Sequence, residues 1–323
     1  MIKTKIGIVG YGNLGRGVEK GIKLCADMEL VGIFTRRDPK NIDSDSPVYN
    51  INEILEFKDK IDVLILCGGS ANDIPEQAPI LAKDFNTVDS FDNHKFIPQY
   101  YKKMDEIAKN NENVSVISSG WDPGLFSINR ILSEAILPDG ENYTFWGKGV
   151  SQGHSDAIRR IEGVKSAIQY TIPNQDMIDD IGSGKDVEYE SHNAHKRDCY
   201  VVLEEGYDED QIRESIVNMP EYFAGYETTV NFINQDEFDK NHRGMPHGGQ
   251  VIRRGYTSDE NLALYKFSLE LGSNPEFTAS VNIAYARACH RLALEKKYGA
   301  YTVIDIAPIY LSPKSDEEIR KMI

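Results

Sequence analysis

The sequence has few cysteines and no long apolar run, and each absence excludes a class of protein. The four cysteines, Cys25, Cys67, Cys199 and Cys289, lie far apart and form no C-x-x-C pair. We therefore expect no disulfide framework and a reduced, cytoplasmic setting. No apolar run approaches the roughly 18 residues needed to cross a membrane. The N-terminal apolar run is interpreted as a strand rather than a signal peptide.

Positive charge is also scarce. The chain has 36 Lys and Arg residues against 51 Asp and Glu residues, which gives a formal net charge of −15. Such a surface repels nucleic acid and anionic membranes, so neither is an expected partner. The seven histidines and four cysteines show no ligand spacing such as H-E-x-x-H, so no metal site is expected. With 323 residues, 40% of them hydrophobic, the chain is long enough for two domains with sizeable cores.

The clearest positive signal is a glycine-rich turn near the N-terminus. An apolar run at Lys5–Val9 precedes the turn, helical spacing of apolar residues follows it, and Leu30–Phe34 is a second apolar run. This order predicts a strand, a G-x-G-x-x-G turn, a helix and a strand, which is the context of dinucleotide binding. The helix N-terminus would offer N–H groups to a pyrophosphate. The expected contacts of the turn are Gly10, Tyr11, Gly12, Asn13, Leu14 and Gly15.

The residues after the second strand indicate which dinucleotide binds. A site for NAD would carry Asp or Glu there to hold the ribose 2′-hydroxyl. This chain has Thr35, Arg36 and Arg37 instead, and no carboxylate at the strand end. Two guanidinium groups and a hydroxyl suit a 2′-phosphate, so we predict NADP. The alternative is that both arginines belong to a solvated loop.

Further strands and helices alternate up to about residue 120, which predicts a parallel, doubly wound Rossmann sheet. The expected strands are 61–67, Thr87–Phe91 and Val114–Ser118, and the expected helices are Pro75–Phe85 and Ile97–Ala108. Ligands of such sheets bind at the carboxyl ends of the strands. Residues at these ends complete the predicted cofactor site: Cys67, Gly68, Gly69, Ser70, Ser90, Phe91, Asp92, Ser119, Gly120, Trp121, Asp122 and Pro123.

The pattern after this point predicts a second, α+β domain that carries an open mixed sheet for substrate binding and dimerisation. The expected strands are Val164–Ile172, Asp198–Leu203, Glu227–Ile233, Gln250–Arg254 and Leu262–Leu271. The predicted domains are residues 1–120 and 121–276, with residues 277–323 packing back on the first. The acidic segment Gln175–Glu190 is interpreted as a surface excursion.

Asp122 has two possible roles. Asp122 followed by Pro123 is typical of a helix N-cap with proline at the first helical position, here before a helix at Leu125–Ile136. The alternative is that Asp122 binds a ligand at the end of the last strand of the first domain. Both interpretations stay open.

Five motifs in order along the chain resemble those of the meso-diaminopimelate dehydrogenase family, and the resemblance runs nearly end to end. The motifs are Gly10–Arg16, Asp92–His94, Gly120–Gly124, Ser151–Asp156 and Gly244–Gly249. The family oxidises the D-configured centre of meso-2,6-diaminopimelate with NADP and releases ammonia. The product is L-2-amino-6-oxopimelate, which cyclises to tetrahydrodipicolinate. The resemblance implies this reversible reaction of lysine biosynthesis, and a homodimer.

The resemblance also implies roles for single residues. It assigns Asp92 and Asp122 to the D-amino centre as substrate-binding and catalytic residues, while the identity of any single base stays open. Arg197 would grip the distal carboxylate, although a strand arginine at such a position is more often part of a solvated ion pair. Asp156 could orient the amine or polarise a water molecule. The remaining implied substrate contacts are Trp146, Gln152, Gly153, Thr171, His247 and Asn274.

Two alternatives of different kinds remain. A broad-specificity D-amino-acid dehydrogenase on the same scaffold would keep Asp92 and Asp122 but would not need the grip of Arg197. A non-catalytic NADP-binding sensor would bind the cofactor without turnover. The polar groups suited to both ends of a dicarboxylate argue against the sensor.

Overall fold

The computed structural model describes residues 3–323, which form two compact units. Unit 1 comprises the described residues up to 128 together with residues 275–323, and unit 2 comprises residues 129–274. Unit 1 extends beyond the predicted boundary at residue 120 because Leu125 and Ile128 pack against its core. None of the helices within residues 3–323 has the length and apolar character needed to cross a membrane.

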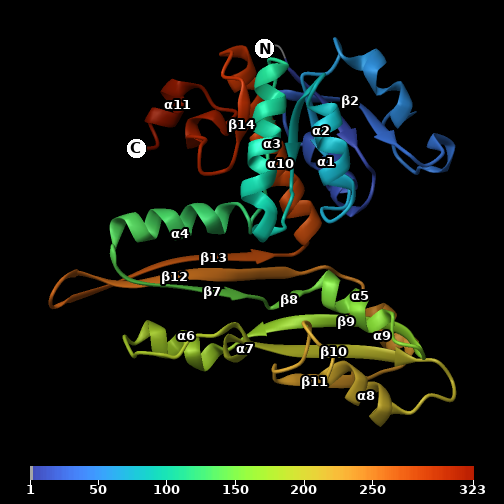
Figure 1. Cartoon of the computed structure of the whole chain (residues 1–323), viewed down its shortest axis with the longest axis vertical. Coiled ribbons are helices and arrows are strands. Elements are labelled where there is room, and N and C mark those ends of the chain that lie inside the picture. The colour runs from blue at the N-terminus through green and yellow to red at the C-terminus, as the bar shows by residue number, and fades with distance from the viewer. Residues whose placement is uncertain (1–2) are drawn as a thin grey trace. The chain divides into compact units, whose positions relative to one another are not determined.

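Unit 1 is built on a seven-stranded parallel sheet with the strand order β14-β6-β5-β4-β1-β2-β3. Figure 1 labels two of its strands, β2 and β14. This strand order confirms the predicted doubly wound Rossmann fold. The short outer strands β3 and β14 were not predicted, because three residues are too few to show a periodic pattern. The strands are β1 (Thr4–Val9), β2 (Met28–Thr35), β3 (Val48–Asn50), β4 (Val63–Leu66), β5 (Asn86–Asp89), β6 (Val114–Val116) and β14 (Gly299–Tyr301).

Both faces of this sheet are covered, which explains the continuous apolar runs of its central strands. Along β4, Val63 and Ile65 belong to one core cluster, whereas Leu64 and Leu66 belong to the other. The helices of unit 1 are α1 (Asn13–Ile22), α2 (Asp73–Leu81), α3 (Ile97–Asn110), α10 (Asn274–Leu294) and α11 (Asp316–Arg320). Short 3₁₀ turns are η1 (Pro39–Asn41), η2 (Ile51–Phe57), η3 (His94–Phe96) and η4 (Pro308–Tyr310). Helix α4 (Leu125–Ile136) begins in unit 1 and ends in unit 2.

Helix α10 lies against α1 through small residues. A Cβ atom added to Gly17 would lie 3.0 Å from the Cβ atom of Ala279, and one added to Gly21 would lie 2.6 Å from Ile283. The two helices therefore pack closely. Their apolar residues join the same core cluster, together with Ile6 and Ile8 of β1. Residues far apart in the sequence thus support the strand that leads into the glycine turn.

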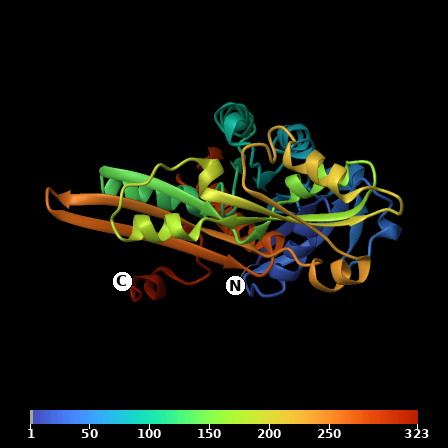
Figure 2. The same ribbon diagram turned by 90° about the horizontal axis from the view of Figure 1, so that it is seen from below.

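Unit 2 is the predicted α+β domain with an open mixed sheet, and it contains a second, antiparallel sheet as well. The four-stranded sheet has the order β11-β10-β9-β8, with β10 and β11 parallel, and the three-stranded antiparallel sheet has the order β13-β12-β7. Strands β12 and β13 form a long hairpin, drawn in orange in Figure 2. The strands are β7 (Asp139–Trp146), β8 (Gly149–Val150), β9 (Val164–Pro173), β10 (His195–Leu203), β11 (Thr228–Phe232), β12 (His247–Ser258) and β13 (Asn261–Leu271). The helices are α5 (Gln152–Arg159), α6 (Gln175–Gly182), α7 (Ser191–Ala194), α8 (Glu209–Val217) and α9 (Gln235–Asn241).

The segment 175–190 is not a surface excursion, as the sequence analysis proposed. Its first half forms α6, and the side chain of Asn174 accepts a hydrogen bond that caps this helix. Ile178 and Ile181, three residues apart, face the same way and are buried against Tyr143 and Phe145 of β7. The helix was not predicted because only two apolar residues repeat within an otherwise acidic segment, and two residues are too few to indicate a helical period.

Asp122 does not occupy the predicted N-cap position. Helix α4 begins at Leu125, so Gly124 holds that position, and Asp122 lies in a turn between the paired residues Trp121 and Gly124. Gly124 has φ +140°, and a Cβ atom there would lie 1.7 Å from the carbonyl oxygen of Gly120. The turn therefore requires glycine at this place. It moves Asp122 and Pro123 out of the first helical turn.

Candidate active site

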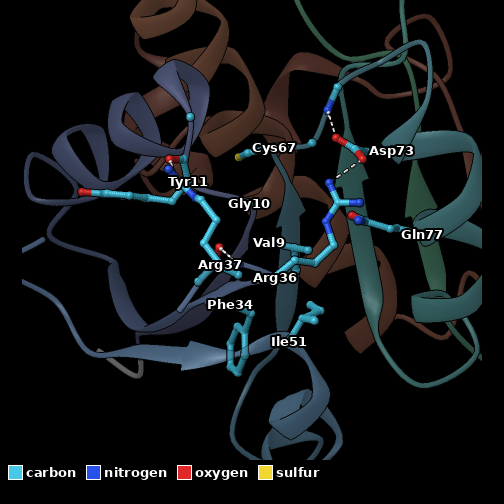
Figure 3. A pocket seen from close by; sticks show the side chains of 14 residues that line it. Val9, Gly10, Tyr11, Phe34, Arg36, Arg37, Ile51, Cys67, Asp73 and Gln77 are labelled. Atoms are coloured by element: carbon cyan, nitrogen blue, oxygen red, sulfur yellow. Dashed lines mark hydrogen bonds and ion pairs between the residues drawn. The ribbon is translucent and has the colours of Figure 1, made fainter. Parts of the chain in front are cut away.

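A pocket lies at the carboxyl ends of β1, β2 and β4, where parallel sheets bind nucleotides (Figure 3). Nine of the predicted cofactor residues line it: Gly10, Tyr11, Gly12, Thr35, Arg36, Arg37, Cys67, Gly68 and Gly69. Sequence reasoning missed five lining residues, Val9, Phe34, Ile51, Asp73 and Gln77. The other predicted cofactor residues are not part of its lining: Asn13, Leu14, Gly15, Ser70, Ser90, Phe91, Asp92, Ser119, Gly120, Trp121, Asp122 and Pro123.

The three glycines of the turn serve different purposes. Gly10 has φ +89°, and a Cβ atom at Gly15 would lie 2.4 Å from the carbonyl oxygen of Gly10. The backbone turn and the close packing of α1 therefore require both residues. A Cβ atom at Gly12, by contrast, would meet no protein atom within 4 Å. Gly12 holds the N-cap position of α1 and leaves room for a pyrophosphate at the helix N-terminus, so the turn fits a dinucleotide.

The end of β2 presents two arginines with different partners (Figure 3). The Nη2 atom of Arg37 donates to the carbonyl oxygen of Tyr11 at 2.5 Å, and the backbone N–H of Arg37 donates to Thr35 Oγ1 at 3.1 Å. Arg36 instead forms an ion pair with Asp73, with 2.6 Å between Nη2 and Oδ1. The strand end itself carries no carboxylate, as the sequence shows, but α2 brings one to the pocket. No local pattern could have revealed Asp73, because it lies 37 residues away.

Asp92 lies beside Ser70, at the ends of the neighbouring strands β5 and β4. The Ser70 hydroxyl donates to Asp92 Oδ1 at 2.6 Å and accepts from the backbone N–H of Asp92 at 2.9 Å. Asp92 is exposed, and Asp122 is half-buried. Trp121 is buried and packs edge-on against Phe126. The loops that follow β4 and β5 are thus joined by a serine and the aspartate that the sequence analysis assigned to the substrate.

A buried carboxylate, Asp89, holds the loops after β5 and β6 together. Its Oδ1 atom accepts from the backbone N–H groups of Phe91 and Ser118, each at 3.0 Å. Its Oδ2 atom accepts from the Tyr100 hydroxyl at 2.7 Å. Burial raises the pKa of Asp89, and the three donors act in the opposite direction. Phe91 immediately precedes Asp92, and Ser118 leads into the turn that contains Asp122, so Asp89 braces both segments.

In unit 2, Arg197 and Thr171 lie directly opposite each other on the antiparallel strands β10 and β9. Arg197 Nη1 donates to Thr171 Oγ1 at 2.9 Å, and the guanidinium carbon lies 4.0 Å from the ring centroid of Tyr226. Arg197 is only 8% exposed, its Nε atom has no partner, and it forms no ion pair with a carboxylate within residues 3–323. A buried guanidinium without an acidic partner is prepared to bind an anion.

Thr171 can add a hydrogen-bond donor to the anion site at Arg197. Its hydroxyl oxygen accepts from Arg197 and, at 3.4 Å, from Gln169 Nε2. A hydroxyl has one proton to donate besides two acceptor positions. The hydroxyl proton of Thr171 therefore remains to be donated, and together with Arg197 it suits a carboxylate.

The loop 244–249 brings four other predicted residues near one another. Backbone hydrogen bonds join Gly147 to Gly248 at 2.8 Å and Val150 to Pro246 at 2.9 Å, and the N–H of Asn274 donates to Met245 at 2.9 Å. Gln152 Nε2 donates to Met245 Sδ at 3.4 Å. These contacts tie the segments of Trp146, Gln152 and Asn274 to the loop that contains His247. A Cβ atom at Gly153, on the first turn of α5, would meet nothing within 4 Å.

Two residues of α5 differ from the sequence-based view. Asp156 is exposed and forms an ion pair with Arg159 on the same helix, so its carboxylate already has a partner. His154 was not predicted as a site residue. Its Nδ1 atom lies 2.7 Å from Ser151 Oγ, and burial, together with the charge of Arg197, lowers the pKa of His154 to about 4. His154 is therefore neutral near pH 7.

Within residues 3–323, no group of three or more His, Cys, Asp or Glu side chains is arranged to hold a metal ion. The Rossmann sheet and the pocket at the glycine turn define a dinucleotide-binding protein, and the polar cluster around Arg197 provides a separate site suited to an anion. Comparison with known proteins identifies its family. Residues 120–273 match the model of the diaminopimelic acid dehydrogenase C-terminal domain.

Relatives and solved structures agree over the whole chain. The meso-diaminopimelate D-dehydrogenase of Lysinibacillus sphaericus is 55% identical over 323 residues, 99% of each chain. A C. glutamicum diaminopimelate dehydrogenase solved with diaminopimelate has a TM-score of 0.92 and 46% identity, and an engineered D-amino acid dehydrogenase bound to NADP⁺ has a TM-score of 0.86 and 45% identity. Both alignments cover 99% of each chain. The present chain belongs to the meso-diaminopimelate D-dehydrogenase family.

Proposed function

We propose that this chain catalyses the reversible, NADP-dependent oxidative deamination of the D-centre of meso-2,6-diaminopimelate, a reaction of lysine biosynthesis. The products are L-2-amino-6-oxopimelate, which cyclises to tetrahydrodipicolinate, and ammonia. The relatives at about half identity over the full length support this reaction. The observation that carries the proposal is buried Arg197, whose Nε atom is unpartnered and which has no acidic partner among the described residues. A substrate with a second carboxylate supplies that partner.

The glycine turn and the end of β2 hold the cofactor in this proposal. The N-terminus of α1 binds the pyrophosphate above Gly12, and Thr35, Arg36 and Arg37 contact the 2′-phosphate. When bound, NADP supplies the nicotinamide ring that accepts hydride from the D-centre. The protein positions the reactants and excludes competing reactions.

Asp92 and Asp122 bind the amino group of the reacting D-centre. The amine must be uncharged to expel hydride, and a carboxylate or a bound water molecule can take its proton. The hydroxyl of Ser70 holds Asp92 Oδ1, which leaves Oδ2 for the amine. Water then attacks the resulting imine of the substrate, and ammonia leaves.

Arg197 and Thr171 bind the carboxylate of the L-centre, with further polar contacts from His247 and Asn274. Trp146, Gln152 and Gly153 complete the substrate contacts, and Gly153 leaves open space for them. Burial lowers the pKa of His247, so its imidazole is neutral near pH 7 and can donate or accept without adding charge. Asp156 is a weaker candidate because Arg159 already pairs with it.

The test compares substrates that differ in the configuration of the reacting centre or in whether they carry a distal carboxylate. We expect NADPH formation from the meso isomer and little from the LL isomer, which has no D-centre. Arg197→Met should lose on the order of 3 kcal/mol in kcat/KM for the meso isomer, because the distal carboxylate loses its buried partner. With D-alanine, which has no distal carboxylate, the loss should be much smaller. Equal losses for both substrates would contradict the assignment of Arg197.

The second candidate function is that of a broad-specificity D-amino-acid dehydrogenase. Two solved structures of an engineered D-amino acid dehydrogenase resemble this chain and support this candidate. If D-alanine and D-lysine are turned over by the wild type as efficiently as meso-diaminopimelate, this second function is the better description. Binding of NADP without any turnover would instead point to a sensor.

We further propose that the chain is a cytoplasmic homodimer. The exposed apolar side chains of unit 2 support dimerisation. Ile131, Leu132 and Ile136 of α4 are 52%, 46% and 56% exposed, and Tyr256 and Leu262 of the β12–β13 hairpin are 38% and 40% exposed. Clusters of this kind mark protein–protein interfaces.

A further inference from the structure

The carboxylate of Asp73 joins two sides of the cofactor pocket (Figure 3). Asp73 is the first residue of α2. Its Oδ2 atom accepts from the backbone N–H of Gly69 at 2.9 Å, and its Oδ1 atom lies 2.6 Å from Arg36 Nη2. The side chain also packs against the loop that follows β4, since a Cβ atom at Gly68 would lie 2.7 Å from the Cβ atom of Asp73. The carboxylate is therefore held in place from both ends.

The two arginines of the pocket are consequently not equivalent. Arg37 donates to a neutral carbonyl group, that of Tyr11, whereas Arg36 is paired with a charged group. NADP differs from NAD by a 2′-phosphate, an anion that prefers the same guanidinium groups as a carboxylate does. A 2′-phosphate that contacts Arg36 must replace Asp73 or share the arginine with it. NAD makes no such demand.

We propose that Asp73 is a specificity-determining residue that lowers the affinity for NADP by competing with the 2′-phosphate for Arg36. Binding of NADP exchanges the Arg36–Asp73 ion pair for an Arg36–phosphate contact, whereas binding of NAD leaves the ion pair intact. Asp73 thus reduces the preference for NADP below what Arg36 and Arg37 alone would provide. This inference rests on the NADP site of the proposed function, but it concerns binding and needs no turnover.

Asp73→Asn isolates the charge, because the amide oxygen of asparagine can still accept from Gly69. Dissociation constants for NADP⁺, NAD⁺ and 2′,5′-ADP are measured by calorimetry at low salt, in wild type and variant. We expect NADP⁺ and 2′,5′-ADP to bind roughly fivefold more tightly or better, because a competing like charge is removed. NAD⁺ should change less than about twofold. Unchanged or weaker binding of NADP⁺ would overturn the proposal.

Two controls separate competition from other effects of charge. Asp84→Asn makes the same charge change in another ion pair, that of Lys58 and Asp84 at 2.7 Å, whose residues do not line the pocket, and it should leave all three constants unchanged. In an Arg36→Ala background, Asp73→Asn should no longer tighten NADP⁺, since Arg36, the arginine that pairs with Asp73, is gone. If the gain persists there, Asp73 acts by direct repulsion and the competition for Arg36 is refuted. If wild type binds NADP⁺ but does not oxidise diaminopimelate, only the proposed reaction fails.

Discussion

At the scale of single residues, the proposed distal site combines charge with strict burial. Arg197 and His154 influence each other, since the charge of Arg197 helps to lower the pKa of His154. A neutral His154 avoids a second positive charge beside the guanidinium. The proposed distal site would then attract one carboxylate through Arg197 alone. It would not have to bury a second unpaired cation, a protonated His154.

This arrangement makes stability depend on pH in a predictable direction. The pKa of His154 is about 4 in the folded protein and near 6.5 in an unfolded chain, so the unfolded state takes up the proton first as the pH falls. His154 should therefore cost nothing above about pH 6.5 and should reduce the free energy of unfolding by about 2 kcal/mol at pH 5.

The measurement is chemical denaturation at about pH 7 and about pH 5, in wild type and His154→Gln. Glutamine can keep a hydrogen bond to Ser151 but does not titrate. The variant should lose less stability between the two pH values than wild type does. His195 and His247, whose pKa values burial also lowers, remain in both proteins, so the difference between the proteins reports His154 alone. Identical pH dependence in the two proteins would mean that His154 is not the group responsible.

At the scale of elements, the ends of β5 and β6 carry the proposed catalytic aspartates, and Asp89 fixes these ends relative to each other. Tyr100→Phe removes one of the three donors to the buried carboxylate. We expect a loss of stability of about 1–3 kcal/mol, since removing the donor leaves a buried carboxyl oxygen without its partner. We also expect kcat to fall severalfold, because the segments of Asp92 and Asp122 lose their bracing. Cofactor affinity should stay nearly constant, because Asp89 and Tyr100 do not line the nucleotide pocket.

A matched control exists on the same two strands. Thr87 donates to Ser115 at 3.0 Å, and both residues are fully buried within the sheet, before the strands end. Ser115→Ala should also lower stability, but it should leave kcat of the folded protein unchanged. Equal effects of the two variants on kcat would show that the Asp89–Tyr100 pair supports only the fold.

The sequence predicted the secondary structure unequally well, and the reasons lie in particular elements. Strands β1, β2 and β4 were found because they are buried on both faces and read as continuous apolar runs. Strand β7 and helix α6 were missed. Half of β7, from Asp139, is polar and exposed, and α6 buries only Ile178 and Ile181 within an acidic segment. Of the two interpretations of Asp122, the helix N-cap was wrong, because α4 begins only after Gly124.

At the scale of the whole molecule, the proposed homodimer predicts a measurable change of mass. Wild type should have twice the monomer mass in light scattering. Ile131→Glu should shift the protein toward monomer, because a charge buried at an apolar interface is costly. Leu24→Glu is the matched control, since Leu24 is an 88% exposed leucine of unit 1 outside the proposed surface, and it should leave the dimer intact. A monomeric wild type would refute dimerisation, and a fully dimeric Ile131→Glu would place the interface elsewhere.

The sequence by itself determined the features that depend on neighbouring residues. The glycine turn between two apolar runs, the arginines that follow the second run and the five ordered motifs each lie within a few residues, so they predicted the Rossmann fold, NADP and the family. Tertiary structure decided which distant residues meet. It brought Asp73 to Arg36, Asp89 to Ser118 and Thr171 to Arg197. These pairs depend on how helices pack and on the register of strands, which join residues separated by 26 or more positions. A pattern with the period of a helix or strand carries no record of such contacts.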